Sequence, residues 1–346
     1  MNDIQRLFCC CGCLRLKQNN QIAHHNFEDP TTFYIYLGID SLNISTSTSL
    51  IIADFGSSYG KYSIQTMKII IEYLKKTKKF LGIPLIIHND IITNNWTKFF
   101  QFLIDDNSYY GLATGRSFYE QCLPTNSLSI GYSSASLHYL SKKPCNIHNH
   151  CYFQFANDNE RKLFQHQSKL DFDLFIEHRS HELISGGILI LNIPSINEKG
   201  EMGFDHYFDL IYKCAQLISR LTTDELVDFT IPFYLRSLSE CIDMELFHRC
   251  SLKLIKVELV CLKSLIFRQY RNHEITHADL AKSLTMLMQS GTELALKQSL
   301  QINGRSNQEI DEIIIQFWHL YEQTINNEVF ENDINTYATY LILKKE

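Results

Sequence analysis

The sequence predicts an α/β fold, in which helices cover both faces of a doubly wound, mostly parallel sheet and a helical cap lies over one edge. Three observations predict it. Short apolar runs alternate with helical periods through residues 50–193, as in parallel strands joined by right-handed helical crossovers. The run Ile188–Ile193 is apolar at almost every position, as in a strand buried on both faces. After Pro194 helical periods predominate, which predicts the cap.

The first unit along the chain is a strand, a turn of small residues and an amphipathic helix. The strand is the apolar run Leu50–Ala53, and after Ser63 apolar residues recur every three or four positions, which indicates a helix. Asp54 and Gly56 begin the turn, where small side chains let a ligand approach the backbone and the helix start offers free N–H groups. Open α/β sheets bind nucleotides at such a turn, although an ordinary connection explains these residues in isolation equally well.

Further β-rich runs complete the parallel part of the sheet. Strands are predicted at residues 83–87, 109–113, 128–132 and 188–193, and helices at 95–104 and 172–183. We expect Ser185–Gly187 to break the chain between the last helix and the last strand. Asp90 follows the strand 83–87. A carboxylate in this position accepts hydrogen bonds from ribose hydroxyls or caps a turn.

The C-terminal part of the chain is predicted to be mainly helical. Helices are expected at residues 204–221, 238–247, 278–302 and 308–325, and strands at 252–262 and 337–344. The segment Ile231–Tyr234 contains a proline and is predicted to be a rigid loop between the first two helices. For residues 33–37, both a helix and an extended segment fit the aromatic composition.

Length and composition restrict the class of protein. Of the 346 residues, 45% are hydrophobic and 20% are charged, which is a globular, soluble composition. The net charge of −6 provides no basic field, so no nucleic-acid partner is expected. No apolar run approaches the roughly 20 residues of a membrane-spanning helix, and no secretory signal is apparent. We therefore expect a cytoplasmic protein with reduced thiols, and for the cluster Cys9–Cys13 a flexible segment is favoured over a zinc half-site or palmitoylation.

Six segments, taken together and in this order, resemble the SABATH family of S-adenosylmethionine-dependent methyltransferases. They are ADFGSSYGKYS, IIHNDIITNNWTKFF, GRSFYEQCLP, SIGYSSASLHYLSKKP, DFDLFIEHRSHELISGGILIL and IPFYLRSLSE. The resemblance spans roughly residues 15–330. It implies a Rossmann-like methyltransferase fold, S-adenosylmethionine as cofactor, and methylation of the carboxylate of a small acid. Members of the family methylate salicylate, benzoate, jasmonate and indole acetate, and one branch methylates ring nitrogens of xanthine alkaloids.

The family's cofactor contacts correspond to nine residues of this chain. They are Asp54, Gly56, Ser57 and Tyr62 for the methionine part, Asp90 for the ribose, Ile91, Ser117 and Phe118 for the adenine, and Ser134 for the wall of the pocket. None of them is expected to act as an acid or a base. A carboxylate substrate with a pKa near 4 is already ionised at pH 7, so methyl transfer requires orientation and exclusion of water.

The resemblance assigns the substrate carboxylate to hydrogen-bond donors. They are Gln21, for which Gln18 is an alternative, His138 and Tyr139. His138 has an equally good interpretation as a hydrogen-bonded histidine at the end of an apolar strand. The family usually has a tryptophan at Tyr139 and a tyrosine at Ala135, so the identity of the acid is open. Tyr139 still offers an O–H donor.

The resemblance also bears on metals, domains and assembly. Some relatives have a metal near the cap, but Thr230 replaces the asparagine of their motif, so no metal is expected. Residues 1–40 are expected to complete the active site, residues 41–196 to form the cofactor-binding core, and residues 197–336 to form the helical cap, which contributes the core strand 252–262. Residues 337–346 supply the final core strand. A homodimer is expected.

Two functional alternatives stay open at this point. The first is a small-molecule N-methyltransferase of the same family. The second is a non-catalytic cofactor-binding relative, because the substitutions at Ala135 and Tyr139 alter the substrate pocket. A nicotinamide-dependent oxidoreductase is disfavoured, because the third glycine of the dinucleotide-binding fingerprint is missing.

Overall fold

A twisted sheet runs through the molecule, and its strand order determines where a ligand binds. The structure is a computed structural model and describes residues 30–45, 49–104, 106–330 and 334–346. Within these residues seven strands form one sheet in the order β3-β2-β1-β4-β5-β7-β6. The strands are β1 Ile51–Phe55, β2 Leu85–Asp90, β3 Tyr110–Gly115, β4 Leu128–Ser134, β5 Leu183–Ser195, β6 Leu252–Lys263 and β7 Asn335–Lys345. The first five are parallel, whereas β7 runs antiparallel to β5 and β6.

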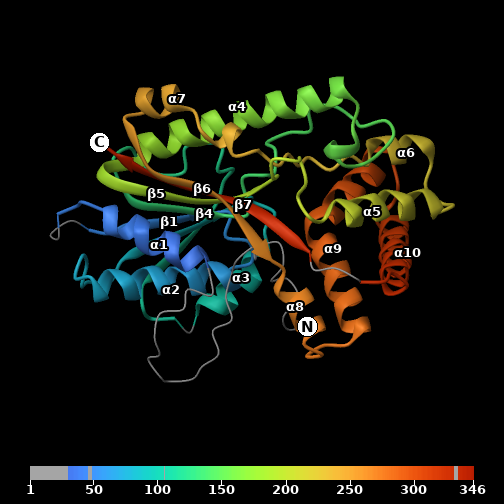
Figure 1. Ribbon diagram of the computed structural model, residues 1–346, viewed down its shortest axis with the longest axis horizontal. Coiled ribbons are helices and arrows are strands. Elements are labelled where there is room, and N and C mark those ends of the chain that lie inside the picture. Colours follow the sequence, from blue (N-terminus) through green and yellow to red (C-terminus); the bar gives the residue numbers. More distant parts are fainter. Residues whose placement is uncertain (1–29, 46–48, 105, 331–333) are drawn as a thin grey trace.

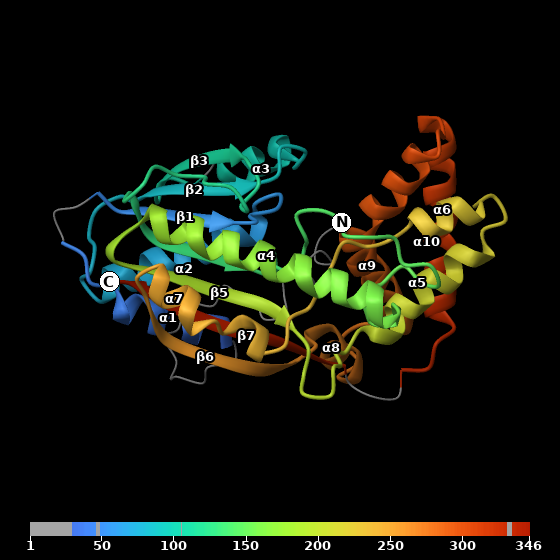
Figure 2. The same ribbon diagram turned by 90° about the horizontal axis from the view of Figure 1, so that it is seen from above.

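Helices cover both faces of the sheet, as Figures 1 and 2 show. The helices of the sheet region are α1 Pro30–Ser41, α2 Lys61–Lys76, α3 Trp96–Leu103, α4 Asp158–Glu182 and α7 Met244–Arg249. Alternate strand residues pack against the two layers: Ile52 belongs to the core that α1 and α2 cover, and Ala53 belongs to the core beneath α4 and α7. The period of two residues along a strand is the reason for this alternation. The sheet is therefore doubly wound.

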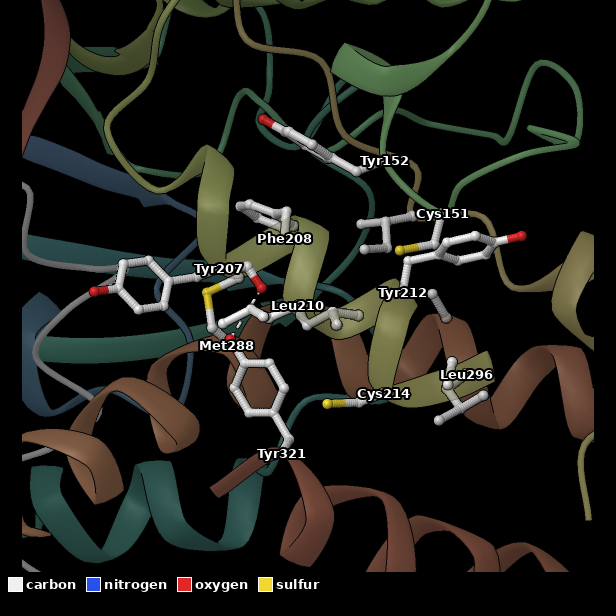
Figure 3. Close-up of a cluster of buried hydrophobic side chains, with 14 of the residues drawn as sticks. Cys151, Tyr152, Tyr207, Phe208, Leu210, Tyr212, Cys214, Met288, Leu296 and Tyr321 are labelled. Atoms are coloured by element: carbon white, nitrogen blue, oxygen red, sulfur yellow. Dashed lines mark hydrogen bonds between the residues drawn. The ribbon is translucent and has the colours of Figure 1, made fainter. Parts of the chain in front are cut away.

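The cap is a helical layer with its own hydrophobic core beyond one end of the sheet. Its helices are α5 Asp205–Leu217, α6 Thr223–Asp228, α8 Leu265–Arg271, α9 His277–Ile302 and α10 Asn307–Asn326. Figure 3 shows side chains of α5, α9 and α10 pointing toward one another. The Tyr321 hydroxyl donates a hydrogen bond of 3.0 Å to the Tyr207 carbonyl, and the rings of Tyr152 and Phe208 stack with centroids 4.0 Å apart. Because buried tyrosines require such partners, this core fixes the cap helices relative to one another.

The strand predictions are confirmed, whereas several helix bounds are wrong. The helix predicted at 172–183 begins at Asp158, where Asn157 and Glu160 form a capping box. Buried polar side chains such as Gln167 and Asp171 interrupt its apolar period, so its first half was not predicted. Residues 33–37 belong to the helix α1.

The break predicted at Ser185–Gly187 is also wrong. The strand β5 begins at Leu183 and continues through the glycines. Gly186 has a φ of +79°, and a Cβ at this position would collide with the backbone of Asn43. The Gly186 carbonyl accepts a hydrogen bond of 3.1 Å from Asn43 N–H. The glycine therefore permits close approach of the segment after α1 rather than ending an element.

Two further helix predictions are corrected, one in the cap and one beside the sheet. The helix predicted at 204–221 ends at Leu217, and Thr222 then starts α6 through a capping box with Glu225. The helix predicted at 238–247 is a 3₁₀ turn followed by α7, because the Asp243 side chain caps a new helix by accepting from Leu246 N–H. The sequence predictions miss α6 and α8 altogether.

Candidate functional site

The carboxyl ends of the parallel strands bring together residues that are far apart in the sequence. Asp54 pairs with His88 of β2 and with Tyr132 of β4. Further along the same edge, Asp90 pairs with Gly115 of β3, and Ser134 of β4 pairs with Asn192 of β5. The strand order reverses between β1 and β4. In open α/β sheets ligands bind outside the carboxyl ends at such a switch point.

The turn after β1 is held tightly against β2. The N–H groups of Gly56 and Ser57 both donate to the Asn89 carbonyl, at 2.8 and 2.9 Å. Gly56 and Gly60 have φ values of +92° and +97°. A Cβ at Gly56 would collide with Ser136, and a Cβ at Gly60 would collide with the ring of Phe99. These two positions therefore require glycine, and the turn brings backbone close to the switch point.

Asp90 is the last residue of β2 and is anchored at both carboxylate oxygens. Oδ2 accepts a hydrogen bond of 2.6 Å from Ser58 N–H, and Oδ1 accepts one of 2.8 Å from Ile91 N–H. Burial raises the pKa of Asp90, and these two hydrogen bonds oppose the shift. Each carboxylate oxygen keeps a second lone pair. Asp90 thus orients the first turn and can still accept hydrogen bonds from a ligand.

Asp54 is a second carboxylate at the same edge and is almost completely buried, at 3% exposure. Burial raises its pKa to about 7; a hydrogen bond with Ser63 lowers the value, and the charge of Asp90 raises it. The Ser63 hydroxyl oxygen in turn lies 2.6 Å from Nδ1 of His88. A cationic ligand group would stabilise the ionised form of such a buried acid, because a nearby positive charge lowers the pKa of a carboxyl group.

Three further residues predicted to line the cofactor site are Ser57, Tyr62 and Ser134. The Ser57 hydroxyl is buried, with the residue at 4% exposure, and has no hydrogen-bond partner among the described residues. A buried hydroxyl is rarely left unsatisfied, so this one suits a ligand. Tyr62 is buried in the first turn of α2. Ser134 is partly buried, and its hydroxyl accepts a hydrogen bond of 3.1 Å from the Asn192 side chain.

The residues predicted to touch the adenine lie past the ends of β2 and β3. Ile91 is 45% exposed and follows Asp90, whereas Phe118 is only 9% exposed and packs against the ring of Phe175. Ser117 is partly exposed. Asn89, for which the sequence predicts no role, donates from its side chain to the carbonyls of Thr114 and Arg116 at 3.3 and 2.9 Å. It therefore joins the turn after β1 to the loop after β3.

His138 and Tyr139 lie in the turn after β4 and meet a loop of the cap. Tyr139 forms an isolated antiparallel bridge with Phe233, and their ring centroids are 4.4 Å apart. The His138 carbonyl accepts a hydrogen bond of 2.9 Å from Tyr234 N–H, and the Pro232 carbonyl accepts one of 2.8 Å from Leu140 N–H. The rigid loop predicted at 231–234 therefore docks directly onto the predicted substrate residues.

Burial determines the protonation state of His138 on this side. His138 is 1% exposed. Its burial and, to a smaller extent, the nearby charge of Arg236 lower its pKa to about 3, so the ring is neutral at pH 7. Tyr139 is partly buried, and its carbonyl accepts a hydrogen bond of 2.6 Å from the Tyr119 hydroxyl. Gln18, Gln21 and the cluster Cys9–Cys13 lie outside the described residues.

The described residues contain neither a cluster of metal-ligating side chains nor a helix that could span a membrane. No group of three or more histidine, cysteine, aspartate or glutamate residues there has an arrangement that could hold a metal ion. Thr230 takes part in local structure, since its hydroxyl oxygen accepts a hydrogen bond of 2.9 Å from Ile147 N–H. In the same part of the chain, every helix is too short or too polar to cross a membrane.

Comparison with known proteins gives one consistent result. Residues 33–346 match the sequence model of a family described as SAM dependent carboxyl methyltransferase. A probable S-adenosylmethionine-dependent methyltransferase of Arabidopsis thaliana is 30% identical over 230 residues, which are 59% of this chain and 64% of that protein. Farnesoic acid carboxyl-O-methyltransferase of A. thaliana is 28% identical (61% and 69% covered), and loganic acid O-methyltransferase of Catharanthus roseus is 27% identical (53% and 54%). The chain spans about two thirds or less of the length of these relatives.

A solved structure of loganic acid methyltransferase with SAH superimposes with a TM-score of 0.71 and 18% identity, covering 94% of this chain and 98% of that one. This likeness confirms the Rossmann-like methyltransferase fold. The family match covers nearly the whole chain, and it confirms the resemblance that the six sequence segments indicate. The cofactor of the family is S-adenosylmethionine, and the two carboxylates, the glycine turn and the unsatisfied Ser57 hydroxyl fit it. The chain therefore belongs to the SABATH family of S-adenosylmethionine-dependent carboxyl methyltransferases.

Proposed function

We propose that this protein transfers the methyl group of S-adenosylmethionine to the carboxylate of a small acid and forms a methyl ester. The observation that carries the proposal is the pair of buried carboxylates, Asp54 and Asp90, at the switch point of the sheet in a chain of this family. S-adenosylmethionine supplies a methyl group on a positively charged sulfur, and a nucleophilic oxygen takes it up by in-line displacement.

The cofactor is proposed to lie along the ends of β1, β2 and β3. Asp54, with its pKa raised to about 7 by burial, would be ionised by the positive charge of the methionine part. Gly56, Ser57 and Tyr62 would form the remaining contacts of this part. Asp90 would accept hydrogen bonds from the ribose, because each of its oxygens retains a lone pair.

The remaining proposed contacts concern the adenine and the wall of the pocket. Ile91, which is exposed at the end of β2, would cover one part of the adenine. Ser117 and Phe118 would bracket the ring from the loop after β3. Ser134 would line the pocket from β4, on the side that faces the acid. An exposed apolar side chain such as Ile91 is well suited to a flat apolar ring, because covering it removes apolar surface from water.

The acid is proposed to lie between the turn after β4 and the cap. Tyr139, His138 and either Gln21 or Gln18 would donate hydrogen bonds to its carboxylate. The neutral state of His138 at pH 7 suits this role, because a neutral imidazole can donate one hydrogen bond without giving up its proton. No base is needed, since the carboxylate is already ionised. The protein's contribution is alignment of the oxygen with the methyl group and exclusion of water.

We also propose a division of labour along the chain. Residues 1–40 would complete the acid side, residues 41–196 would bind the cofactor, and residues 197–336 would cover the site. The packing of α1 against β5 and β7 supports the first point, because it brings the start of the described chain to the sheet. Residues 252–262 and 337–346 belong to the core sheet, as the pairing of β6 with β7 supports.

A homodimer in the cytoplasm completes the proposal. The edge strand β3 exposes Tyr110 and Leu112, and the neighbouring helix α3 exposes Phe100. An edge strand with exposed apolar side chains can pair with a second chain. The seven cysteines in the described residues are all free thiols, as expected in a reducing compartment. Sedimentation equilibrium tests the assembly: a mass of one chain at micromolar concentration would exclude the dimer.

The function is tested in two steps. Calorimetry should first show binding of S-adenosylmethionine to the purified protein in the micromolar range. A screen of small carboxylic acids and nitrogen heterocycles with radiolabelled S-adenosylmethionine should then yield a labelled, base-labile methyl ester. Label that is stable to base and appears only on a nitrogen heterocycle would indicate N-methylation instead. Binding without any turnover across the screen would favour a non-catalytic relative.

A further inference from the structure

We propose that Arg179 and Glu182, in the last turn of α4, are positioning residues that hold the loop after β3 in the shape that receives the adenine. The inference rests on the proposed function, because that function places Ser117 and Phe118 beside the adenine. Both side chains are completely buried and form an ion pair, with 2.7 Å between Arg179 Nε and Glu182 Oε2. They are proposed to act through the backbone of residues 116–123, without touching the ligand.

The ion pair supplies hydrogen bonds to four backbone groups of this loop. Arg179 Nη1 donates to the Phe118 carbonyl at 2.6 Å, and Nη2 donates to the Glu120 carbonyl at 2.8 Å. Glu182 Oε1 accepts from Cys122 N–H at 2.6 Å and from Leu123 N–H at 3.0 Å. Residues 116–123 contain neither helix nor strand, so they have no regular ladder to satisfy these groups. Buried backbone groups require partners, and here two side chains provide them.

Arg179 also connects this loop to the end of β1. Its guanidinium carbon lies 4.1 Å from the ring centroid of Phe55, the last residue of β1, and 5.1 Å from that of Phe175. Phe175 packs in turn against Phe118 with ring centroids 6.0 Å apart. The turn that follows Phe55 is proposed to hold the methionine part. One planar guanidinium therefore fixes the distance between the two ends of the cofactor site.

The chemistry of the pair is specific to arginine. A guanidinium presents five N–H donors in a rigid plane, and here they serve a carboxylate and two carbonyls at once while the flat face lies over a ring. A lysine carries the same charge but has a single ammonium group with no plane. Replacing Arg179 with lysine therefore keeps the charge that balances Glu182 and removes the planar arrangement of N–H donors. The loop should then lose its fixed shape without the cost of an unpaired buried charge.

The chain offers a control in Arg305 of the cap. Arg305 Nε lies 2.6 Å from Oε1 of Glu225, whose side chain is 1% exposed, and Arg305 Nη2 donates to the Arg220 carbonyl at 2.8 Å. Like Arg179, this arginine therefore joins a buried carboxylate to a backbone carbonyl. Its partners belong to the cap, beside the start of α6. Arg305→Lys should destabilise the cap locally and leave the adenine loop intact.

The experiment compares Arg179→Lys with Arg305→Lys in the full chain. The affinity for S-adenosylhomocysteine is measured by calorimetry, and hydrogen–deuterium exchange of the peptide that covers residues 116–123 is measured with and without that ligand. We expect Arg179→Lys to weaken binding about tenfold or more, the effect of losing a charge-assisted hydrogen bond, and to speed exchange of this peptide in the free protein. Arg305→Lys should change affinity less than about twofold and leave the exchange of this peptide unaltered.

The outcomes separate this inference from the proposed function. If the wild-type protein fails to bind S-adenosylhomocysteine, the proposed function fails. If the wild type binds and the two variants lose affinity equally, or if Arg179→Lys exchanges like the wild type in residues 116–123, the positioning role is wrong. Should Arg179→Lys not fold, Glu182→Gln carries the same test, because it keeps the side-chain shape and removes the charge. It should also speed exchange at 116–123 and weaken binding, and wild-type values for both would overturn the inference.

Discussion

The carboxyl edge has two parts, which we call the cofactor side and the acid side after the ligands proposed for them, and the two are constructed differently. The cofactor side comprises residues 54–63, 88–91 and 115–118, and the sheet itself organises it: Asn89 alone accepts two backbone hydrogen bonds and donates two more from its side chain. The acid side comprises residues 135–140 and 231–236, and it forms where a sheet loop meets a cap loop through aromatic packing and two backbone hydrogen bonds. The first side depends on the sheet, whereas the second depends on the docking of the cap.

The two sides also differ in their buried charge. On the cofactor side, the cation of Arg179 is balanced by Glu182, and the negative charges are those of Asp54 and Asp90. On the acid side, Arg236 is held by carbonyl oxygens and forms no ion pair with a carboxylate in the described part of the chain. Its charge contributes to the lowered pKa of His138. A cationic cofactor and an anionic substrate suit these two environments, and two of the departures from the family, Ala135 and Tyr139, fall on the acid side.

Among the variants that test the difference between the two sides, Asp54→Asn is expected to have the largest effect on ligand binding. The variant removes the negative charge and keeps the shape, so the affinity for S-adenosylmethionine should fall by about 3 kcal/mol, roughly a hundredfold. Burial penalises the ionised Asp54 in the free protein, so its contribution to stability is present below pH 4 and is lost as pH rises through 7. The thermal midpoint at pH 8 should therefore not fall, which differential scanning calorimetry can check.

A control for Asp54→Asn is Asp106→Asn. Asp106 has a lowered pKa, to which hydrogen bonds from Ser108 and Lys68 contribute, so its charge stabilises the fold. This substitution should lower the thermal midpoint and leave cofactor affinity within about twofold of the wild type. Equal cofactor affinity in wild type and Asp54→Asn would remove Asp54 from the site.

The acid side is tested by Tyr139→Phe. This change keeps the ring that packs on Phe233 and deletes one donor, so kcat/KM for the identified acid should fall roughly 10- to 150-fold, or about 1.5–3 kcal/mol. Cofactor affinity should not change, since the cofactor side does not depend on the cap loop. Steady-state kinetics and calorimetry on the same preparation provide both values. Undiminished turnover would show that the carboxylate is held by other groups.

The dependence of cofactor binding on pH tests the difference in buried charge between the cofactor side and the acid side. With a pKa of about 7 in the free protein, Asp54 is ionised in about a tenth of molecules at pH 6 and about nine tenths at pH 8. A cationic ligand requires the ionised form, so apparent affinity should rise roughly tenfold over this interval. His138, with a pKa of about 3, should add no step. Calorimetry at both pH values tests this, and a wild-type profile as flat as that expected for Asp54→Asn would contradict it.

The smallest effect is expected from Ser57→Ala. The Ser57 hydroxyl is buried without a partner in the described structure, so its removal should leave the thermal midpoint unchanged or slightly higher. If the hydroxyl bonds the cofactor, affinity should fall by about 0.5–1.5 kcal/mol, roughly twofold to tenfold. Ser129→Ala is a suitable control, because that hydroxyl is also buried and unpartnered but lies early in β4. A variant Ser57→Ala that binds as tightly as Ser129→Ala would exclude the contact.

Sequence alone determined the sheet and the cofactor side. Parallel strands carry their own signal in apolar runs, and the residues that follow each run, such as Asp54 and Asp90, are brought to one edge by the parallel direction of the strands. The glycines of the first turn are local requirements of backbone conformation at φ values near +90°. These features depend on short stretches of chain, so a reader of the sequence can place them without knowing which elements pack together.

Only the tertiary structure decided the acid side, the start of α4 and the role of the Arg179–Glu182 pair. Phe233 meets Tyr139, and Arg179 meets the Phe118 carbonyl, across long separations in the sequence. Buried polar residues also obscured the period of α4, because hydrogen bonds from other parts of the chain satisfy them. An arginine or a glutamate in a sequence is normally read as exposed. A charged side chain can be buried without destabilising the fold only when hydrogen-bonding or charged partners surround it. Here these partners come from distant segments, so tertiary packing, and not the local sequence pattern, determines the burial.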